Sequence, residues 1–191
     1  CTLIARDRDG YRATVDTPFF NLGGVQTSGI DVQFNWSLPL LAGRLNTNAV
    51  VNFLDYYRDQ VNPSDPFIDS TGTFRSGGQY DVRTFATLTY VQGGWSAGLR
   101  HRYLPSIESA DYATNKATTV QGAGGYNIFD AFGSFTVSKQ VTVRGGIDNL
   151  LDREPARVGI NPGVTAASGS TNAQYYDVLG RRFYLSVQLD L

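Results

Sequence analysis

"GRRFYLSVQLDL" (180–191) is the stretch that decides the fold. Its apolar residues occupy every second position from Phe183 to Leu191, and polar or amphipathic residues fill the positions between them. Alternation with a period of two predicts an extended strand with one apolar and one polar face. The strand runs to the last residue of the sequence, so we expect it to pair with another strand instead of ending in a cap.

The same alternation recurs upstream, which predicts seven strands in all. Apart from the last, the predicted strands are 29–38, 43–57, 80–91, 94–104, 126–138 and 141–151. The match is imperfect, since some apolar residues fall on the polar face, among them Val50, Leu54, Phe85 and Phe132. Most of these strands have about ten residues or more, which suits the ~9–11 residues of a transmembrane strand. No apolar run approaches the ~18 residues of a transmembrane helix.

The predicted connections alternate between short and long. The short ones are 39–42, 92–94 and 139–140, and the long ones are 58–79, 105–125 and 153–175. Long loops without structure are unusual in compact soluble domains. Short turns at one end and long loops at the other are typical of outer-membrane barrels.

Aromatic residues gather near both ends of the predicted strands. Trp36, Tyr90 and Trp95 lie beside short turns, whereas Tyr57, Tyr80, Tyr103 and Tyr126 lie beside long loops. Two such belts are typical of interfacial girdles. The alternative is that aromatic residues simply favour strands.

These observations predict an all-β, antiparallel transmembrane meander. An odd number of strands does not suit a single-chain bacterial barrel, and an open sheet in lipid would leave its edges unpaired. We therefore expect the chain to be part of a larger barrel, with a wet polar face. The residues expected to face lipid are Ile30, Val32, Phe34, Trp36, Phe183, Leu185, Val187, Leu189 and Leu191.

Three ordered stretches resemble one protein family. "NLGGVQTSGIDVQFNWSL" (21–38), "VRGGIDNLLDREP" (143–155) and "YYDVLGRRFYLSVQLDL" (175–191) resemble the C-terminal region of TonB-dependent receptors. These are active transporters in the outer membrane of Gram-negative bacteria. The family usually ends in an aromatic residue that the barrel-assembly machinery reads, whereas this chain ends in Leu191.

The resemblance implies a barrel of roughly 22 strands closed by an internal plug, with this chain as its last seven strands. Residues 1–24 would then be a partial extracellular loop, and residues 25–191 the C-terminal segment of the outer-membrane barrel domain. The plug and the energy-coupling TonB box would lie outside this sequence. Cys1, the one cysteine, is either a free thiol or the partner of a cysteine upstream, and in the full-length receptor we expect the pairing.

The function implied is binding of a scarce nutrient (siderophore, cobalamin or oligosaccharide) at extracellular loops, and its import with inner-membrane energy. The partners implied are membrane lipid, the plug and remaining strands, the TonB complex, the barrel-assembly machinery and a small-molecule substrate. Two other classes remain open: a passive porin-like or structural outer-membrane barrel, and a soluble carbohydrate-binding β-sandwich.

Other kinds of site have little support in the sequence. The net charge of −1 and the lack of a basic run argue against nucleic acid. His101 is the only histidine and falls on the apolar face, so we expect no catalysis there. We expect no cofactor and no metal, because Asp65 and Asp69 lack the ligand spacing of a calcium loop. "GAGGY" (122–126) lacks the spacing of a nucleotide-binding loop.

Two groups of residues are candidates for ligand binding. Arginines on the predicted polar face could attract an anionic ligand or contact the plug; they are Arg83, Arg100, Arg102 and Arg144. The alternative is a solvated wall balanced by Asp81, Asp130 and Asp148. The second group consists of loop aromatics: Phe67, Phe74, Tyr112, Tyr175 and Tyr176.

Overall fold

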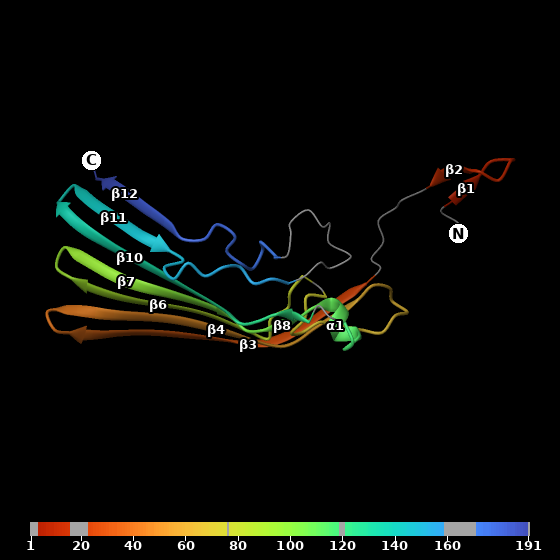
Figure 1. Ribbon diagram of the computed structural model, residues 1–191, viewed down its shortest axis with the longest axis horizontal. Coiled ribbons are helices and arrows are strands. Elements are labelled where there is room, and N and C mark those ends of the chain that lie inside the picture. Colours follow the sequence, from red (N-terminus) through yellow and green to blue (C-terminus); the bar gives the residue numbers. More distant parts are fainter. Residues whose placement is uncertain (1–3, 16–22, 76, 119–120, 159–170, 191) are drawn as a thin grey trace.

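A single curved antiparallel sheet dominates the computed structural model, which describes residues 4–15, 23–75, 77–118, 121–158 and 171–190 (Figure 1). Each long strand pairs with the next long strand along the chain, in the order β3-β4-β6-β7-β10-β11-β12. The long strands are β3 (Gly24–Leu40), β4 (Gly43–Gln60), β6 (Val82–Gln92), β7 (Trp95–Leu104), β10 (Tyr126–Ser138), β11 (Val141–Asp148) and β12 (Arg182–Leu189). The predicted seven-strand antiparallel meander is therefore confirmed, and the sheet is not closed within the described residues.

Smaller elements lie in the long connections and in the N-terminal region. A separate hairpin of β1 (Ile4–Arg6) and β2 (Arg12–Val15) stands apart from the sheet (Figure 1). The other small elements are β5 (Ile68–Asp69), β8 (Ile107–Glu108), α1 (Ala110–Thr114) and β9 (Gly122–Ala123). β5 pairs with β4, and β8 pairs with β9. In the part of the chain described here, no helix has the length and hydropathy to cross a membrane.

The sequence prediction was wrong about several strand ends and about the loops. β3 begins at Gly24 and β4 continues to Gln60, so this hairpin reaches well beyond the predicted ends. β11 ends at Asp148 because Asn149 adopts a left-handed backbone conformation, with φ of 52°. The long connections were expected to be irregular, but they contain paired strands and a one-turn helix capped by the Ser109 hydroxyl.

Strand register places the expected lipid-facing residues on one face of the sheet. Partners across an antiparallel ladder share a face, and so do alternate residues along each strand. Leu185 of β12 is thereby connected to Leu38 of β3 through five intermediate partners, one on each strand between them: Gly145, Gly133, Ala97, Tyr90 and Leu45. We call this side the apolar face and the other side the polar face. Leu191 lies outside the described residues.

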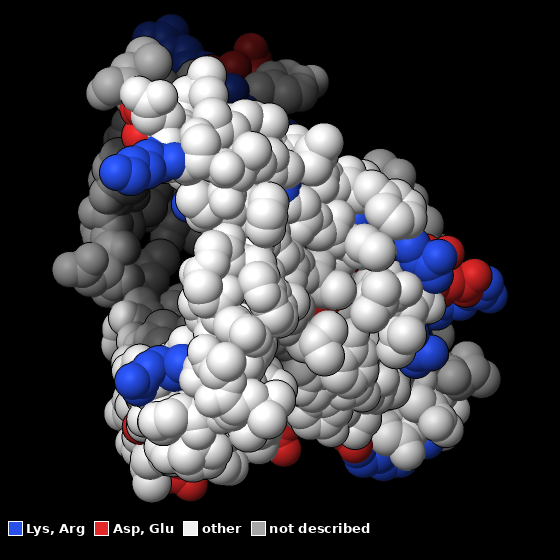
Figure 2. All heavy atoms as spheres, turned by 90° about the vertical axis from the view of Figure 1, so that its left-hand side faces the viewer, with Lys and Arg blue, Asp and Glu red and all other residues white. Residues whose placement is uncertain are grey.

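The apolar face is exposed across the whole sheet. Its uncovered large side chains include Ile30, Phe34, Trp36, Phe53, Leu88, Leu99, Phe135, Phe183, Leu185 and Leu189. In the view onto the short-turn end, most of the surface is uncharged, charged side chains gather near its margins, and the molecule is hollowed on one side (Figure 2). Exposed apolar area on this scale is characteristic of a surface that contacts lipid or protein.

A β-bulge corrects the expected position of Tyr57. The β3–β4 register shifts between Ser28 and Gly29, and Asp55 is the additional residue on β4. Ser28 pairs with Tyr56, which puts Tyr56 on the apolar face and Tyr57 on the polar face. At the loop end of the strands, the belt position predicted for Tyr57 is therefore taken by Tyr56.

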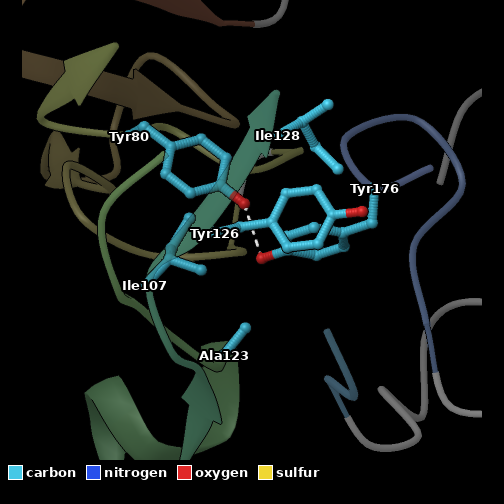
Figure 3. Packing of buried hydrophobic residues seen from close by; sticks show 6 residues of the cluster. All are labelled: Tyr80, Ile107, Ala123, Tyr126, Ile128 and Tyr176. Carbon is cyan, nitrogen blue, oxygen red and sulfur yellow. Dashed lines mark hydrogen bonds between the residues drawn. The ribbon is translucent and has the colours of Figure 1, made fainter. Parts of the chain in front are cut away.

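The buried hydrophobic cluster lies at the loop end of the sheet, where Tyr126 and Ile128 of β10 pack against the long connections (Figure 3). Tyr80, Tyr126 and Tyr176 are almost fully buried there and pack with Ile107, Ala123 and Ile128. The prediction that Tyr80 and Tyr126 belong to an exposed belt is therefore wrong. At the short-turn end the aromatic side chains do meet on the apolar face, where the Tyr90 and Trp95 rings lie 5.5 Å apart.

Candidate functional site

A carboxylate hub lies on the polar face of the sheet, toward the long loops. Asp130 of β10 is only 2% exposed, and Arg100 and Arg102 of β7 lie beside it at 3.7 and 3.3 Å. The register brings them together, since Asp130 is the direct ladder partner of Arg100. The same carboxylate accepts the Asn149 backbone N–H at 2.9 Å. One buried carboxylate thus pairs with two arginines and fixes the start of the β11–β12 connection.

Two aromatic residues that broke the sequence alternation surround Arg100. Its guanidinium lies 6.0 Å from the Phe85 ring centre and 5.6 Å from that of Phe132. The Phe132 ring lies over Gly98, where an added Cβ would come within 2.5 Å of a ring carbon. Phe85 and Phe132 therefore hold a cation against the polar face, and this explains their position there.

The β11–β12 connection is closed at its base by polar contacts. Asp152 accepts the Arg181 backbone N–H at 3.0 Å. Arg182 pairs with Asp148 at 3.5 Å and with Asp177 at 3.7 Å. Asn149 bonds with both the N–H and the C=O of Arg153, which shapes the turn after β11. The residues of the "GIDNLLD" motif thus join the two ends of the loop.

The buried tyrosines join all three long connections. The Tyr80 and Tyr176 hydroxyls lie 2.7 Å apart (dashed line in Figure 3), and the Tyr126 hydroxyl accepts the Asp177 backbone N–H at 3.2 Å. Phe74 and Tyr175 pack around Tyr80, with ring centres 6.2 and 5.4 Å away. Burial raises the pKa of both Tyr80 and Tyr176, so both hydroxyls stay protonated to a higher pH than an exposed tyrosine.

A pocket of about 280 Å³ opens between the polar face and this aromatic cluster. We call it the loop-end pocket. Its apolar and aromatic lining includes Phe85, Leu104, Tyr126, Ile128 and Tyr175. Its polar lining includes Asn52, Arg83, Arg102, Gln174 and Asp177. A mostly apolar concavity with a few converging polar groups is the usual form of a small-molecule site.

Arg83 of β6 differs from the other arginines in this region. Its Nη2 donates to the Gly78 carbonyl at 3.1 Å, and its guanidinium lies 5.5 and 5.7 Å from the ring centres of Tyr80 and Tyr175. Among the described residues it forms no ion pair with a carboxylate. An exposed guanidinium on the pocket wall is therefore available to an acceptor group.

The structure separates the predicted ligand residues into groups. Arg83, Arg102 and Tyr175 line the loop-end pocket, whereas Arg100 lies in the carboxylate hub. Tyr176 is 2% exposed, and Phe74 packs against the same core, so these two hold the loops together.

The remaining predicted residues lie elsewhere. Phe67 is exposed beside the loop end of β3, and Tyr112 lies on α1, where the Lys116 ammonium is 4.2 Å from its ring centre. Arg144 is exposed on the polar face between its ladder partners Ser134 and Ser186, away from the pocket lining.

Sequence reasoning missed several residues that build the pocket. Asn52, Gln174 and Asp177 line it, and Ile128 and Tyr126 form its buried wall. The alternation did place Asn52 on the polar face. Gln174 and Asp177 lie in a loop with no periodicity, so the sequence held no signal for their position.

The residues considered for other chemistry have structural partners. Asp69 pairs with Arg58 at 3.4 Å, and hydrogen bonds from Thr71 lower its pKa. Asp65 accepts hydrogen bonds from Asn62. His101 stacks on Phe129 at 4.5 Å and bonds with Asn127 on the apolar face. Gly122 belongs to β9, where a Cβ would overlap the Ile107 carbonyl. Within the described ranges, no group of three acidic, histidine or cysteine residues could hold a metal ion.

The chain matches a known protein family. A family model described as "TonB dependent receptor-like, beta-barrel" matches residues 3–150, which is well over half of the 191-residue chain. No solved structure matches the chain significantly.

Proposed function

The chain belongs to the TonB-dependent receptor β-barrel family, and on that premise we propose that it is the C-terminal barrel portion of an outer-membrane receptor that imports a scarce nutrient. In this proposal the chain supplies the last seven of roughly 22 strands, and an N-terminal plug occupies the lumen. The TonB complex supplies the energy through the N-terminal part of the receptor. Siderophores, cobalamin and oligosaccharides are the substrate classes to be distinguished.

One observation carries the proposal: a single ladder register gives all seven strands an exposed apolar face and a charged polar face. Such a sheet is stable where lipid covers one side and water or protein fills the other. In a soluble β-sandwich the apolar face would instead pack against a second sheet. Within the described residues no second sheet covers the apolar face.

The contrast between the two ends supports an orientation. The short turns Leu41–Ala42, Gly93–Gly94 and Lys139–Gln140 would face the periplasm, and the structured long loops would face the outside. The loop-end pocket would then open toward external ligand. The free edges of β3 and β12 would pair with the remaining barrel strands, and the barrel-assembly machinery would engage β12.

Energy-dependent uptake separates the receptor from a passive barrel. Cells that depend on the full-length receptor would be supplied with limiting amounts of each candidate nutrient, with and without a protonophore. We expect uptake of one nutrient class that saturates at low concentration and stops when the proton gradient collapses. Uptake that rises linearly with concentration and ignores the protonophore would identify a porin and refute the proposal.

A further inference from the structure

We infer that the loop-end pocket binds an aromatic or similarly flat carboxylate group, with Arg83 as the anchor for the anion. The inference rests on the proposed function, because it names the chemical class that the receptor would recognise. It depends on three features of the pocket: its charge balance, its walls and its size.

The charges around the pocket leave one arginine over. Arg100 and Arg102 share Asp130, and Arg182 lies between Asp148 and Asp177. These contacts link three arginines with three carboxylates. Arg83 has no such partner in the described part of the chain, so it is the pocket-wall arginine that contacts no carboxylate. A ligand carboxylate would complete the balance.

The surroundings of Arg83 favour a planar ligand. The Tyr80 and Tyr175 rings lie near its guanidinium, and its hydrogen bond to the Gly78 carbonyl uses one nitrogen. The orientation of the fork is thereby restricted while other N–H groups stay free, which suits bidentate binding of a carboxylate. Beside the fork, the pocket is lined by Phe85, Ile128 and Tyr175, which would pack against a flat apolar ring.

The size of the pocket sets the size of the group. A water molecule occupies about 30 Å³ of liquid, so a pocket of about 280 Å³ holds the equivalent of about nine waters. A benzoate-sized group, with about nine non-hydrogen atoms, fits that space. We expect the rest of a larger ligand to extend from the pocket toward the loops.

The test uses benzoate and its neutral analogue benzamide as probes. Saturation-transfer NMR would measure the binding of both to the purified full-length receptor that contains residues 1–191. We expect benzoate to bind about tenfold more tightly than benzamide, which corresponds to one charge-assisted contact. Arg83→Gln should abolish that preference, and Arg83→Lys should keep part of it, because the charge remains but the fork is lost.

Arg144→Gln is the matched control, because it removes an exposed polar-face arginine that does not line the pocket. It should leave the benzoate preference unchanged. If Arg83→Gln and Arg144→Gln lost the benzoate preference equally, the preference would come from the overall positive charge of the polar face, and the inference would be wrong. The inference would also be wrong if the wild-type protein showed no preference for benzoate. Should Arg83→Gln fail to fold, Arg83→Lys and Tyr175→Leu still decide, since the latter should weaken both probes alike. The binding measurement does not depend on energised uptake, so its outcome is separate from the test of the proposed function. A passive barrel could still prefer benzoate, and an active receptor could lack that preference.

Discussion

Leu185→Arg tests which side of the sheet meets lipid. Leu185 lies in the middle of β12, is 76% exposed and faces the same side as Ile147 and Phe183. An arginine near the bilayer midplane of an outer-membrane barrel costs roughly 2–4 kcal/mol, falling to about 0–1 kcal/mol near an interface. We therefore expect Leu185→Arg in the full-length receptor to lower the free energy of unfolding by about 2–3 kcal/mol.

Position along the strand gives the comparison. Leu189 shares the apolar face but pairs with Val141, next to the Lys139–Gln140 turn. Four residues at about 3.3 Å each separate it from Leu185 by roughly 13 Å, or roughly 9 Å in depth for a strand tilted by ~45°. Leu189→Arg should therefore cost only about 0–1 kcal/mol.

The control lies on the polar face of the same strand. Gln188 pairs with Thr142, so an arginine there meets no like charge across the ladder. Ser186 is a poorer control, because its partner is Arg144. Reversible urea unfolding from vesicles with shorter and longer acyl chains would measure all three variants. If Gln188→Arg cost as much as Leu185→Arg, or if acyl-chain length changed none of the differences, the assignment of lipid to the apolar face would be wrong.

Three further predictions concern the loop end of the sheet. Asp130→Ala leaves two arginines and the Asn149 N–H without their acceptor, so it should lower the free energy of unfolding in urea by about 2–4 kcal/mol. Asp148 is more exposed, so Asp148→Ala should lower it by less than about 1 kcal/mol. Equal losses in the two variants would contradict the central role of Asp130. Tyr80→Phe and Tyr176→Phe should each lower the free energy of unfolding by about 1–3 kcal/mol, and the double variant should lower it by clearly less than the sum of the two. Additive losses in this double-mutant cycle would argue against the contact between the hydroxyls. Because burial raises the pKa of both tyrosines, the folded state keeps their protons to a higher pH than the unfolded state does. The free energy of unfolding should therefore hold up to about pH 10 and fall above it. In unfolding experiments at a series of pH values, the double Phe variant should show a shallower fall.

The alternation of residues was sufficient to predict the sheet, because each strand lies between one apolar and one polar environment. The seven strands, their order and the polar-face position of Val50, Phe85 and Phe132 follow from a period of two. The bulge at Asp55 shifted that period by one residue, so the period of two predicted the wrong face for Tyr57. No composition rule signals where a single extra residue will sit.

The loop end was less predictable, because contacts distant in sequence build it. Tyr80 and Tyr176 are separated by almost a hundred positions, and only the fold brings their hydroxyls together. The sequence identified Arg83, Arg102 and Tyr175 as candidates by type and face. It did not show that Asp130 pairs with Arg102 while, among the described residues, no carboxylate pairs with Arg83. Charge pairing of this kind depends on register, which periodicity alone does not supply.

Pairing of each long strand only with its neighbours in the chain makes the hairpin a modular unit of this architecture. β6 and β10 both run from a long connection toward a short turn. If β6 and β7 were removed together, the chain would enter β10 from the same end of the sheet at which it now enters β6. Every remaining strand would keep its direction and its sidedness. Loss or duplication of one strand would reverse the direction of every strand that follows. Changes in the circumference of such a wall, by recombination or by engineering, should therefore occur in steps of two strands.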